Sequence, residues 1–392
     1  MTARILVAPL EFKGSLTAGQ AARAMELGVR RGWPEAEVVR LPLADGGPGT
    51  ADALVEALRG RWHPVHVHDP LGRPIDAQWA SWEEGASGVV EMARASGLAL
   101  LAPSERDARV TTTFGTGELI ADAVAQGVRR LLVGVGGSAT NDAGAGALVA
   151  LGYVLLDAGS RPLPPGGLAL RNLDRIEASG VLPELHEVGV TVMTDVQNQL
   201  CGPKGASHVY GPQKGASPQD VVALDAALAH FAEVVKRDLG VDAAGLLGAG
   251  AAGGLAYGLV VGCGAQITRG FQHLAEVVGL DAHLARVDWV LTGEGSLDAQ
   301  TLHGKGPLEL ARRAKSLGKH VVAFAGRVDP GALSTESPFD DAIQVSPANW
   351  TEADPAARAA ANTLLSSAVE RWARSACSPG RVTPGPQGRR RA

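Results

Sequence analysis

The sequence predicts an α/β protein of two domains. A Rossmann/flavodoxin-like parallel-sheet domain is built from both ends of the chain, and a mixed α/β domain is inserted between them. Three observations support this prediction. The 392 residues exceed the length of one ordinary domain. Short apolar segments alternate with helical ones near both chain ends, as in parallel sheets. The 51 glycines can serve many tight turns between such elements.

The first 60 residues contain two strand–helix pairs. Residues 4–9 are a short apolar run typical of a buried strand, and residues 17–31 place small and apolar side chains on one helical face. A second strand is expected over residues 37–43 and a second helix over residues 50–58. Strands separated by helices of this length call for parallel pairing with right-handed crossovers.

The same alternation returns near the C-terminus. We expect strands over residues 287–292, 320–325 and 342–345, and helices over residues 301–317 and 356–374. The middle of the chain differs, because short strand-like segments, Pro/Gly loops and helices are mixed there.

These patterns predict the domain boundaries. Residues 1–70 and 285–375 are expected to form the discontinuous Rossmann-like domain, and residues 71–284 the inserted domain. The basic segment 376–392 has no apolar periodicity, so we expect a disordered tail.

Composition excludes several classes of protein. Aromatic residues make up only 4% of the chain and the net charge is −5, which argues against a nucleic-acid partner. The three cysteines, Cys201, Cys263 and Cys377, are far apart and show no zinc-ligand spacing. A disulfide scaffold is therefore not expected, and a reducing compartment fits better.

One uncharged segment, Ala243–Thr268, is long enough to cross a membrane. It contains eight glycines between Gly245 and Gly264 and few large apolar residues. We therefore expect a buried glycine-rich loop and helix, no membrane partner and a cytoplasmic protein. The N-terminal apolar run is also too short for a signal peptide.

Five glycine-rich loops follow apolar strands, over residues 11–15, 44–50, 134–144, 194–215 and 292–306. Open α/β sheets bind ligands at the carboxyl ends of their strands. Glycine lets backbone N–H groups approach a phosphate, acids suit Mg²⁺, and lysines suit phosphate oxygens. This set of groups is what phosphoryl transfer requires.

Two known nucleotide-binding motifs, the P-loop and the dinucleotide-binding pattern, can be compared with these loops. Gly304-Lys305 is followed by Gly306 and lacks the upstream glycine, so there is no P-loop. Gly134–Ala139 matches the relaxed dinucleotide pattern, and Asp157 lies where a ribose-binding acid is expected. An NAD(P)-dependent oxidoreductase is therefore an alternative, although weak helix formers follow the loop.

Taken together, the loops resemble the bacterial glycerate kinase family that lacks a P-loop. The matching stretches occur in family order between residues 4 and 372. They are FKGSL at 12–16, ADGG at 44–47, GGSATND at 136–142, Asp195 with Asn198, LCG at 200–202, GPQKG at 211–215, LTGEG at 291–295 and LHGK at 302–305.

The resemblance implies an enzyme that phosphorylates D-glycerate with ATP and Mg²⁺, in a cleft between two α/β domains. Family members give chiefly 2-phosphoglycerate, which is the expected product here, and some give 3-phosphoglycerate. The expected partners are therefore the small-molecule substrate and ATP, and a homodimer is left open.

Acids at these motifs are candidates for Mg²⁺ ligands or the general base, namely Asp195, Glu294 and Asp298. Glu294 and Asp298 are four residues apart, so one helical turn would bring them to the same side. Lys13 completes the predicted catalytic set, because a lysine can neutralise phosphate charge.

The remaining candidates bind substrate or nucleotide. Lysines suit a phosphate or the glycerate carboxylate, and Asp45 can orient a substrate hydroxyl. The predicted substrate-binding residues are Glu11, Asp45, Lys214, His303 and Lys305. Nucleotide phosphates are expected at Gly136, Gly137, Ser138, Thr140 and Asn141.

Several residues depart from the family pattern. Leu10-Glu11 stands where Asp-Ser is expected, Pro48 where Glu is expected, and Gln197 and Gln199 flank Asn198 in place of Thr and Pro. We hypothesise that catalysis survives with altered acceptor choice or regiochemistry. A kinase for a related hydroxy acid and a non-catalytic sugar-acid-binding protein therefore stay open.

The departures generate one prediction. If Glu11 compensates for the acids lost from the N-terminal loops, Glu11→Ala will change the steady-state kinetics with glycerate. Unchanged kcat and KM values would show that Glu11 is not the compensating acid.

Overall fold

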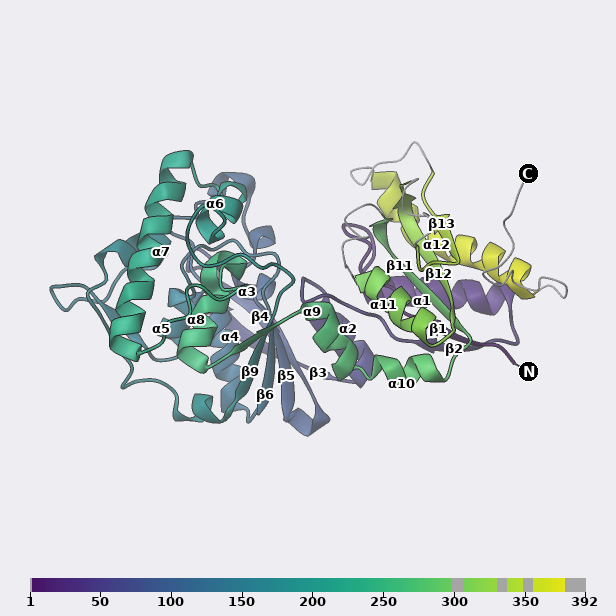
Figure 1. Ribbon diagram of the computed structural model, residues 1–392, viewed down its shortest axis with the longest axis horizontal. Helices are drawn as coiled ribbons and strands as arrows, with labels where there is room; N and C mark the ends of the chain where they lie inside the picture. The colour runs from purple at the N-terminus through teal and green to yellow at the C-terminus, as the bar shows by residue number, and fades with distance from the viewer. Residues whose placement is uncertain (1, 298–305, 330–336, 348–354, 378–392) are drawn as a thin grey trace. The chain divides into compact units, whose positions relative to one another are not determined.

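The computed structural model describes residues 2–297, 306–329, 337–347 and 355–377. The chain divides into two compact units (Figure 1). Unit 1 combines Met1–Leu43 with Gly279–Ala392, and unit 2 is Ala44–Val278.

Unit 1 contains a parallel sheet with the strand order β13-β12-β11-β1-β2. Its strands are β1 (Arg4–Val7), β2 (Glu37–Arg40), β11 (Trp289–Leu297), β12 (His320–Val328) and β13 (Asp341–Gln344). Its helices are α1 (Ala18–Gly32), α10 (Leu280–Ala285), α11 (Gly306–Ser316) and α12 (Pro355–Cys377). The predicted α/β class, with a parallel sheet built from both chain ends, is confirmed.

Local sequence explains where α1 begins and what it packs against. Thr17 caps the helix by accepting from the Gln20 N–H at 3.2 Å, and the Gln20 side chain accepts from the Thr17 N–H. One face of α1 packs closely on α12, as Figure 1 shows. Gly28 and Gly32, one turn apart on α1, allow this approach, because a Cβ at either would lie 2.4 Å from an α12 carbonyl oxygen.

One expected element of unit 1 differs from the structure, and another lies partly outside the described residues. The strand predicted over residues 287–292 continues to Leu297, because Gly293–Leu297 pairs with β12. Glu294 therefore lies in a strand and not in a helical turn, which corrects the spacing argument made for Glu294 and Asp298. The first part of the helix predicted over residues 301–317, residues 301–305, lies outside the described residues.

Unit 2 contains a mixed sheet with the strand order β10-β9-β6-β5-β4-β3. Its strands are β3 (Arg61–His68), β4 (Pro74–Trp82), β5 (Ser87–Glu91), β6 (Arg130–Gly134), β9 (Gly189–Met193) and β10 (Gln266–Thr268). Strands β3 and β4 are antiparallel, and β5, β6, β9 and β10 are parallel. A separate pair is formed by β7 (Val154–Leu156) and β8 (Arg175–Glu177).

Helices surround this sheet. The α-helices are α2 (Thr50–Leu58), α3 (Ala93–Ser96), α4 (Phe114–Ala125), α5 (Ala145–Ala150), α6 (Ala206–Tyr210), α7 (Pro218–Leu239), α8 (Leu255–Cys263) and α9 (Gly270–Val277). Short 3₁₀ turns connect several of them, and η6 (Pro212–Lys214) matters below. Figure 1 shows α4, α5, α7 and α8 on one side of the sheet and α2 and α9 on the other.

The parallel strands of unit 2 end at one level. Glu91 of β5 pairs with Gly134 of β6, Gly134 pairs with Met193 of β9, and Met193 pairs with Thr268 of β10. These four residues are the last of their strands. The loops that follow therefore start side by side at one edge of the sheet.

The unit boundaries fall at other positions than those predicted from the sequence. The prediction placed residues 44–70 with the chain ends, whereas the chain enters unit 2 after Leu43 and leaves it after Val278. The reason lies in β3, which forms an eight-residue antiparallel ladder with β4 and so belongs to the unit 2 sheet. The disordered tail was predicted to begin at residue 376, but α12 continues to Cys377, and the rest of the predicted tail, residues 378–392, lies outside the described residues.

The uncharged segment Ala243–Thr268 forms a loop, the buried helix α8 and strand β10. Gly258 of α8 packs against the backbone of Ala143, where an added Cβ would lie 2.6 Å from the carbonyl oxygen. Within the described part of the chain, no helix has both the length and the apolar character needed to cross a bilayer.

The α1–α12 contact generates a prediction for stability. Gly28→Ala places a Cβ 2.4 Å from the Ser366 carbonyl and 2.7 Å from the Val369 Cβ, so we expect about 1–3 kcal/mol of destabilisation. Helix propensity alone would make the Ala variant more stable by about 1 kcal/mol. The sign of the change in unfolding free energy therefore distinguishes close packing from helix propensity. Urea unfolding measures it.

Gly189→Ala is the matched control. A Cβ at Gly189 would meet its nearest neighbour, the Arg129 carbonyl oxygen, at an ordinary 3.7 Å. We expect its unfolding free energy to change by no more than about 0.5 kcal/mol. A Gly28→Ala protein as stable as the wild type would contradict the close packing of the two helices.

Candidate active site

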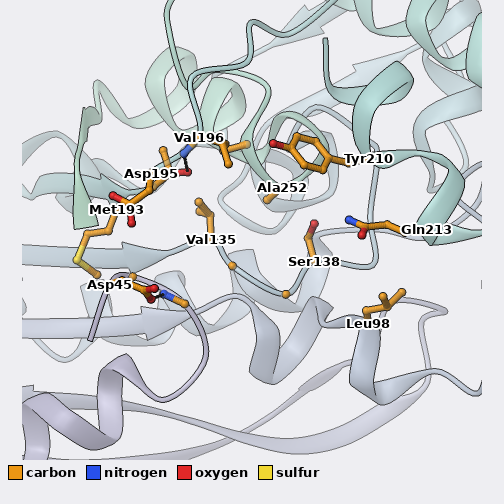
Figure 2. Close-up of a pocket in the computed structure, with 16 residues that line it drawn as sticks. Asp45, Leu98, Val135, Ser138, Met193, Asp195, Val196, Tyr210, Gln213 and Ala252 are labelled. Carbon is orange, nitrogen blue, oxygen red and sulfur yellow. Dashed lines mark hydrogen bonds between the residues drawn. The ribbon is translucent and has the colours of Figure 1, made fainter. Parts of the chain in front are cut away.

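A cavity of about 400 Å³ opens at the carboxyl ends of the parallel strands in unit 2 (Figure 2). Its walls include the loop before α2, the loops after β6 and β9, and the segment from the end of α6 into η6. Met193, the last residue of β9, also lines it. This is the position at which open α/β sheets bind ligands.

Glycine allows the cavity loops to touch through their backbones. A Cβ at Gly136 would lie 2.8 Å from the Cα of Gly47, and one at Gly270 would lie 1.8 Å from the Asp45 carbonyl oxygen. Pro48 packs against the same loop, with its Cγ 3.1 Å from the position of a Cβ at Gly137. Larger residues at these glycines would push the loops apart.

Two carboxylates, Asp45 and Asp195, lie at one end of the cavity in Figure 2. Asp195 follows β9 and accepts a hydrogen bond from the Gly270 N–H at 3.2 Å, whereas Asp45 accepts from the Gly47 N–H at 3.1 Å. The cavity walls withhold water from the Asp195 carboxylate and raise its pKa, and the charge of Asp45 raises it further. The Gly270 N–H and Arg269 partly oppose this rise.

The other end of the cavity carries neutral polar groups. Figure 2 shows Ser138, Tyr210 and Gln213 away from the two carboxylates. The Tyr210 hydroxyl donates to the Asn198 Oδ1 at 2.8 Å, and Asn198 donates to the Lys204 carbonyl at 2.7 Å. These bonds hold the tyrosine ring against the cavity.

The predicted nucleotide-binding residues separate into two groups. Gly136, Gly137 and Ser138 line the cavity. Thr140 and Asn141 are fully buried behind it, and their side-chain oxygens, Thr140 Oγ1 and Asn141 Oδ1, have no hydrogen-bond partner among the described residues.

Lys214, predicted to bind substrate, is also buried. Only 1% of the residue is exposed, and its Nζ donates to the Thr140 carbonyl oxygen at 2.6 Å. Its neighbour Gln213 lines the cavity in its place.

Three predicted residues lie in unit 1. Lys13 is exposed, and its backbone nitrogen lies 3.3 Å from the position that a Cβ would take at Gly295. Glu294 and Glu11 are partly exposed in the same unit. The predicted residues Asp298, His303 and Lys305 lie outside the described part of the chain.

The dinucleotide alternative requires a parallel strand–helix–strand unit after β6. The strand that precedes Asp157 does not supply it, because β7 pairs with β8 in a separate antiparallel sheet, whereas β6 pairs in parallel with β9. Asp157, expected to bind a ribose, instead pairs with Arg161 at 2.9 Å and accepts from the Gly159 N–H at 2.8 Å. These contacts hold a surface turn beside the β7–β8 pair, so Asp157 does not follow a strand that pairs with β6.

Comparison with known proteins decides the family. The glycerate kinase family model matches residues 5–376. The chain belongs to the glycerate kinase family. The prediction from the ordered motifs is thereby confirmed, and the protein is an enzyme of this family.

Known glycerate kinases are similar to this chain over most of its length. The glycerate kinase of Haemophilus influenzae is 44% identical over 323 residues, which cover 82% of this chain and 85% of that protein. The glycerate 2-kinase of Escherichia coli K12 is 43% identical over 323 residues, with the same coverage. The glycerate kinase of Bacillus subtilis 168 is 42% identical over 359 residues, which cover 87% and 94%.

A solved structure shares the fold. The crystal structure of a protein from Salmonella typhimurium LT2, assigned as a glycerate kinase 2, superimposes with a TM-score of 0.86 at 41% identity. The match covers 96% of this chain and 98% of that one.

Sequence reasoning missed one residue that supports the cavity of this glycerate kinase family member. Glu91, the last residue of β5, is 3% exposed and accepts from the Ala51 N–H of α2 at 3.0 Å. It also pairs with Arg94 at 2.6 Å, and Arg94 in turn pairs with Asp52. Glu91 thus fixes the start of α2 and the loop that carries Asp45. A lone acid at the end of an apolar strand was the available signal.

This network generates a prediction. Burial raises the pKa of Glu91, and Arg94 opposes the rise. Glu91→Gln keeps the shape but removes the charge that pairs with Arg94. We expect it to lower the unfolding free energy by about 1–3 kcal/mol in urea unfolding.

The control for this variant is Glu84→Gln, which changes an exposed acid in the turn before β5. We expect it to leave the unfolding free energy within about 0.5 kcal/mol of the wild type. Equal effects of the two substitutions would argue against a buried role for Glu91.

Proposed function

We propose that this enzyme phosphorylates D-glycerate with ATP and releases 2-phosphoglycerate and ADP. Membership of the glycerate kinase family supports a kinase that uses ATP. The site is proposed from one observation. The carboxylates Asp45 and Asp195 line the same cavity as the glycine-rich loop Gly136–Ser138. A relative at 43% identity that is named a glycerate 2-kinase supports phosphorylation of the 2-hydroxyl.

Asp195 is the general base in this proposal. The oxygen of the glycerate hydroxyl attacks the γ-phosphorus of ATP, its proton passes to Asp195, and the bond to the ADP oxygen breaks. A carboxylate with a raised pKa accepts a proton more readily near neutral pH than an ordinary aspartate does.

Mg²⁺ would be held by Asp45. Asp45 suits this ion, because carboxylate oxygens are the donors that Mg²⁺ prefers. The negative charge of Asp45 also disfavours the ionised form of Asp195. A divalent cation at Asp45 would relieve this repulsion. When bound, Mg²⁺ supplies neutralisation of phosphate charge.

The glycine-rich loop is proposed to bind phosphate. Gly136 and Gly137 present backbone to the cavity, and the Ser138 hydroxyl can donate to a phosphate oxygen. Roles for further residues stay proposals. Lys13 and Lys305 would bind a phosphate or the glycerate carboxylate, and Glu294 and Asp298 would bind the metal. His303 and Glu11 would bind the substrate. A cytoplasmic location also stays a proposal, consistent with three free cysteines.

Product analysis tests this proposal. Purified enzyme with ATP, Mg²⁺ and D-glycerate should give the phosphorus NMR signal of 2-phosphoglycerate. Asp195→Asn should lower kcat/KM by about 10²–10⁴-fold, because an amide cannot accept the proton. Circular dichroism checks that the variant is folded.

Asp76→Asn is the control, since Asp76 is an exposed acid of β4 that pairs with His66. It should keep wild-type kcat/KM. A 3-phosphoglycerate signal would overturn the proposed regiochemistry, and the absence of any phosphoester would overturn glycerate as the acceptor. A fully active Asp195→Asn enzyme would overturn the role of Asp195.

A further inference from the structure

A lysine sits behind the cavity wall of unit 2. Lys214, in η6, is 1% exposed, and its Nζ lies 2.6 Å from the Thr140 carbonyl oxygen. Burial lowers the pKa of this amine to about 7, and the nearby carboxylate of Asp142 opposes the effect. An amine is costly to bury, so an apolar side chain of similar length would be easier to accommodate.

A second buried hydrogen bond joins the same two segments. Asn141, next to Thr140, donates from Nδ2 to the Ser207 Oγ of α6 at 2.9 Å. The segment from α6 to η6 is therefore fastened to the end of the loop after β6 at two successive residues. Both bonds are shielded from water.

Each fastened segment contributes one wall of the cavity. The loop after β6 supplies Gly136, Gly137 and Ser138, which only Ala139 separates from Thr140 and Asn141. The other segment supplies Tyr210 and Gln213, and Figure 2 shows both with Ser138 at the end of the pocket away from the carboxylates. The separation of these walls sets the width of that end.

We propose that Lys214 is a positioning residue that holds the glycine-rich loop at a fixed distance from the wall formed by Tyr210 and Gln213. Its role in turnover rests on the proposed function, because that loop is where we place the phosphates. Lys214 acts through the Thr140 carbonyl and touches neither substrate.

Backbone packing around Thr140 makes the position of this carbonyl matter. A Cβ at Gly253 would lie 2.0 Å from the Thr140 oxygen, and the Thr111 hydroxyl donates to the preceding carbonyl of Ala139 at 3.0 Å. The loop is thus held on several sides, and Lys214 is the only charged side chain hydrogen-bonded to it at Thr140 among the described residues. Removing the lysine takes away the hydrogen bond between η6 and the Thr140 carbonyl oxygen, so this side of the loop is no longer held.

Lys214→Met tests the proposal, with Lys214→Gln as the conservative variant. We expect Lys214→Met to keep a cooperative thermal transition near the wild-type melting temperature, because relief of the amine's desolvation offsets the hydrogen bond lost at the Thr140 carbonyl oxygen. Hydrogen–deuterium exchange of the amides in residues 134–142 should become about tenfold faster, while the β3–β4 hairpin stays unchanged. kcat/KM for ATP should fall by about 10–100-fold, because small misplacements of binding groups are costly.

Lys214→Gln keeps an N–H donor and should recover part of both losses. Lys236→Met is the control, since Lys236 is an exposed lysine of α7 that pairs with Asp242, and it should behave as wild type.

Wild-type exchange of residues 134–142 in Lys214→Met would overturn the proposal, and so would equal kinetics for Lys214→Gln and Lys214→Met. A wrong proposed function can be told apart from a wrong role for Lys214, because the hydrogen–deuterium exchange experiment needs no turnover. A wild-type enzyme inactive toward glycerate with faster loop exchange in Lys214→Met would refute the substrate and leave the positioning role in place.

Discussion

The common level at which β5, β6, β9 and β10 end is the constraint on which the candidate site depends. Because Glu91, Gly134, Met193 and Thr268 are paired in one row, the loops that follow are forced together. Their approach is then limited by backbone contact, which only glycine permits at Gly136 and Gly270. The cavity is the space that remains between backbones held at this distance.

Buried polar contacts hold two walls of the cavity. Glu91 fixes α2 and, through it, the loop that carries Asp45. Lys214 and Asn141 fasten the opposite wall. Each contact uses a side chain that water does not reach, so competing solvent cannot weaken it. The groups that line the cavity, such as Asp195 and Gln213, are left available for ligands.

Sequence patterns predicted what is local and missed what is long-range. The helix predicted over residues 17–31 is observed as α1, Ala18–Gly32, with Thr17 as its N-cap. Asp45 and Asp195 were both selected, and the sheet brings them to one cavity. The burial of Lys214 could not be predicted, since its partner Thr140 lies 74 residues away. The strand character of Glu294 was hidden by its glycine neighbours and arises from pairing with β12.

The pairing of α1 with α12 also has a consequence for synthesis of the chain. The first helix made must wait for the last described one, because Gly28 and Gly32 pack against residues 366–374. Unit 2 is complete once residue 278 has left the ribosome, and it can fold while the N-terminal segment is still unpartnered. The apolar face of α1 is therefore exposed throughout translation, when a chaperone has the longest time to bind it.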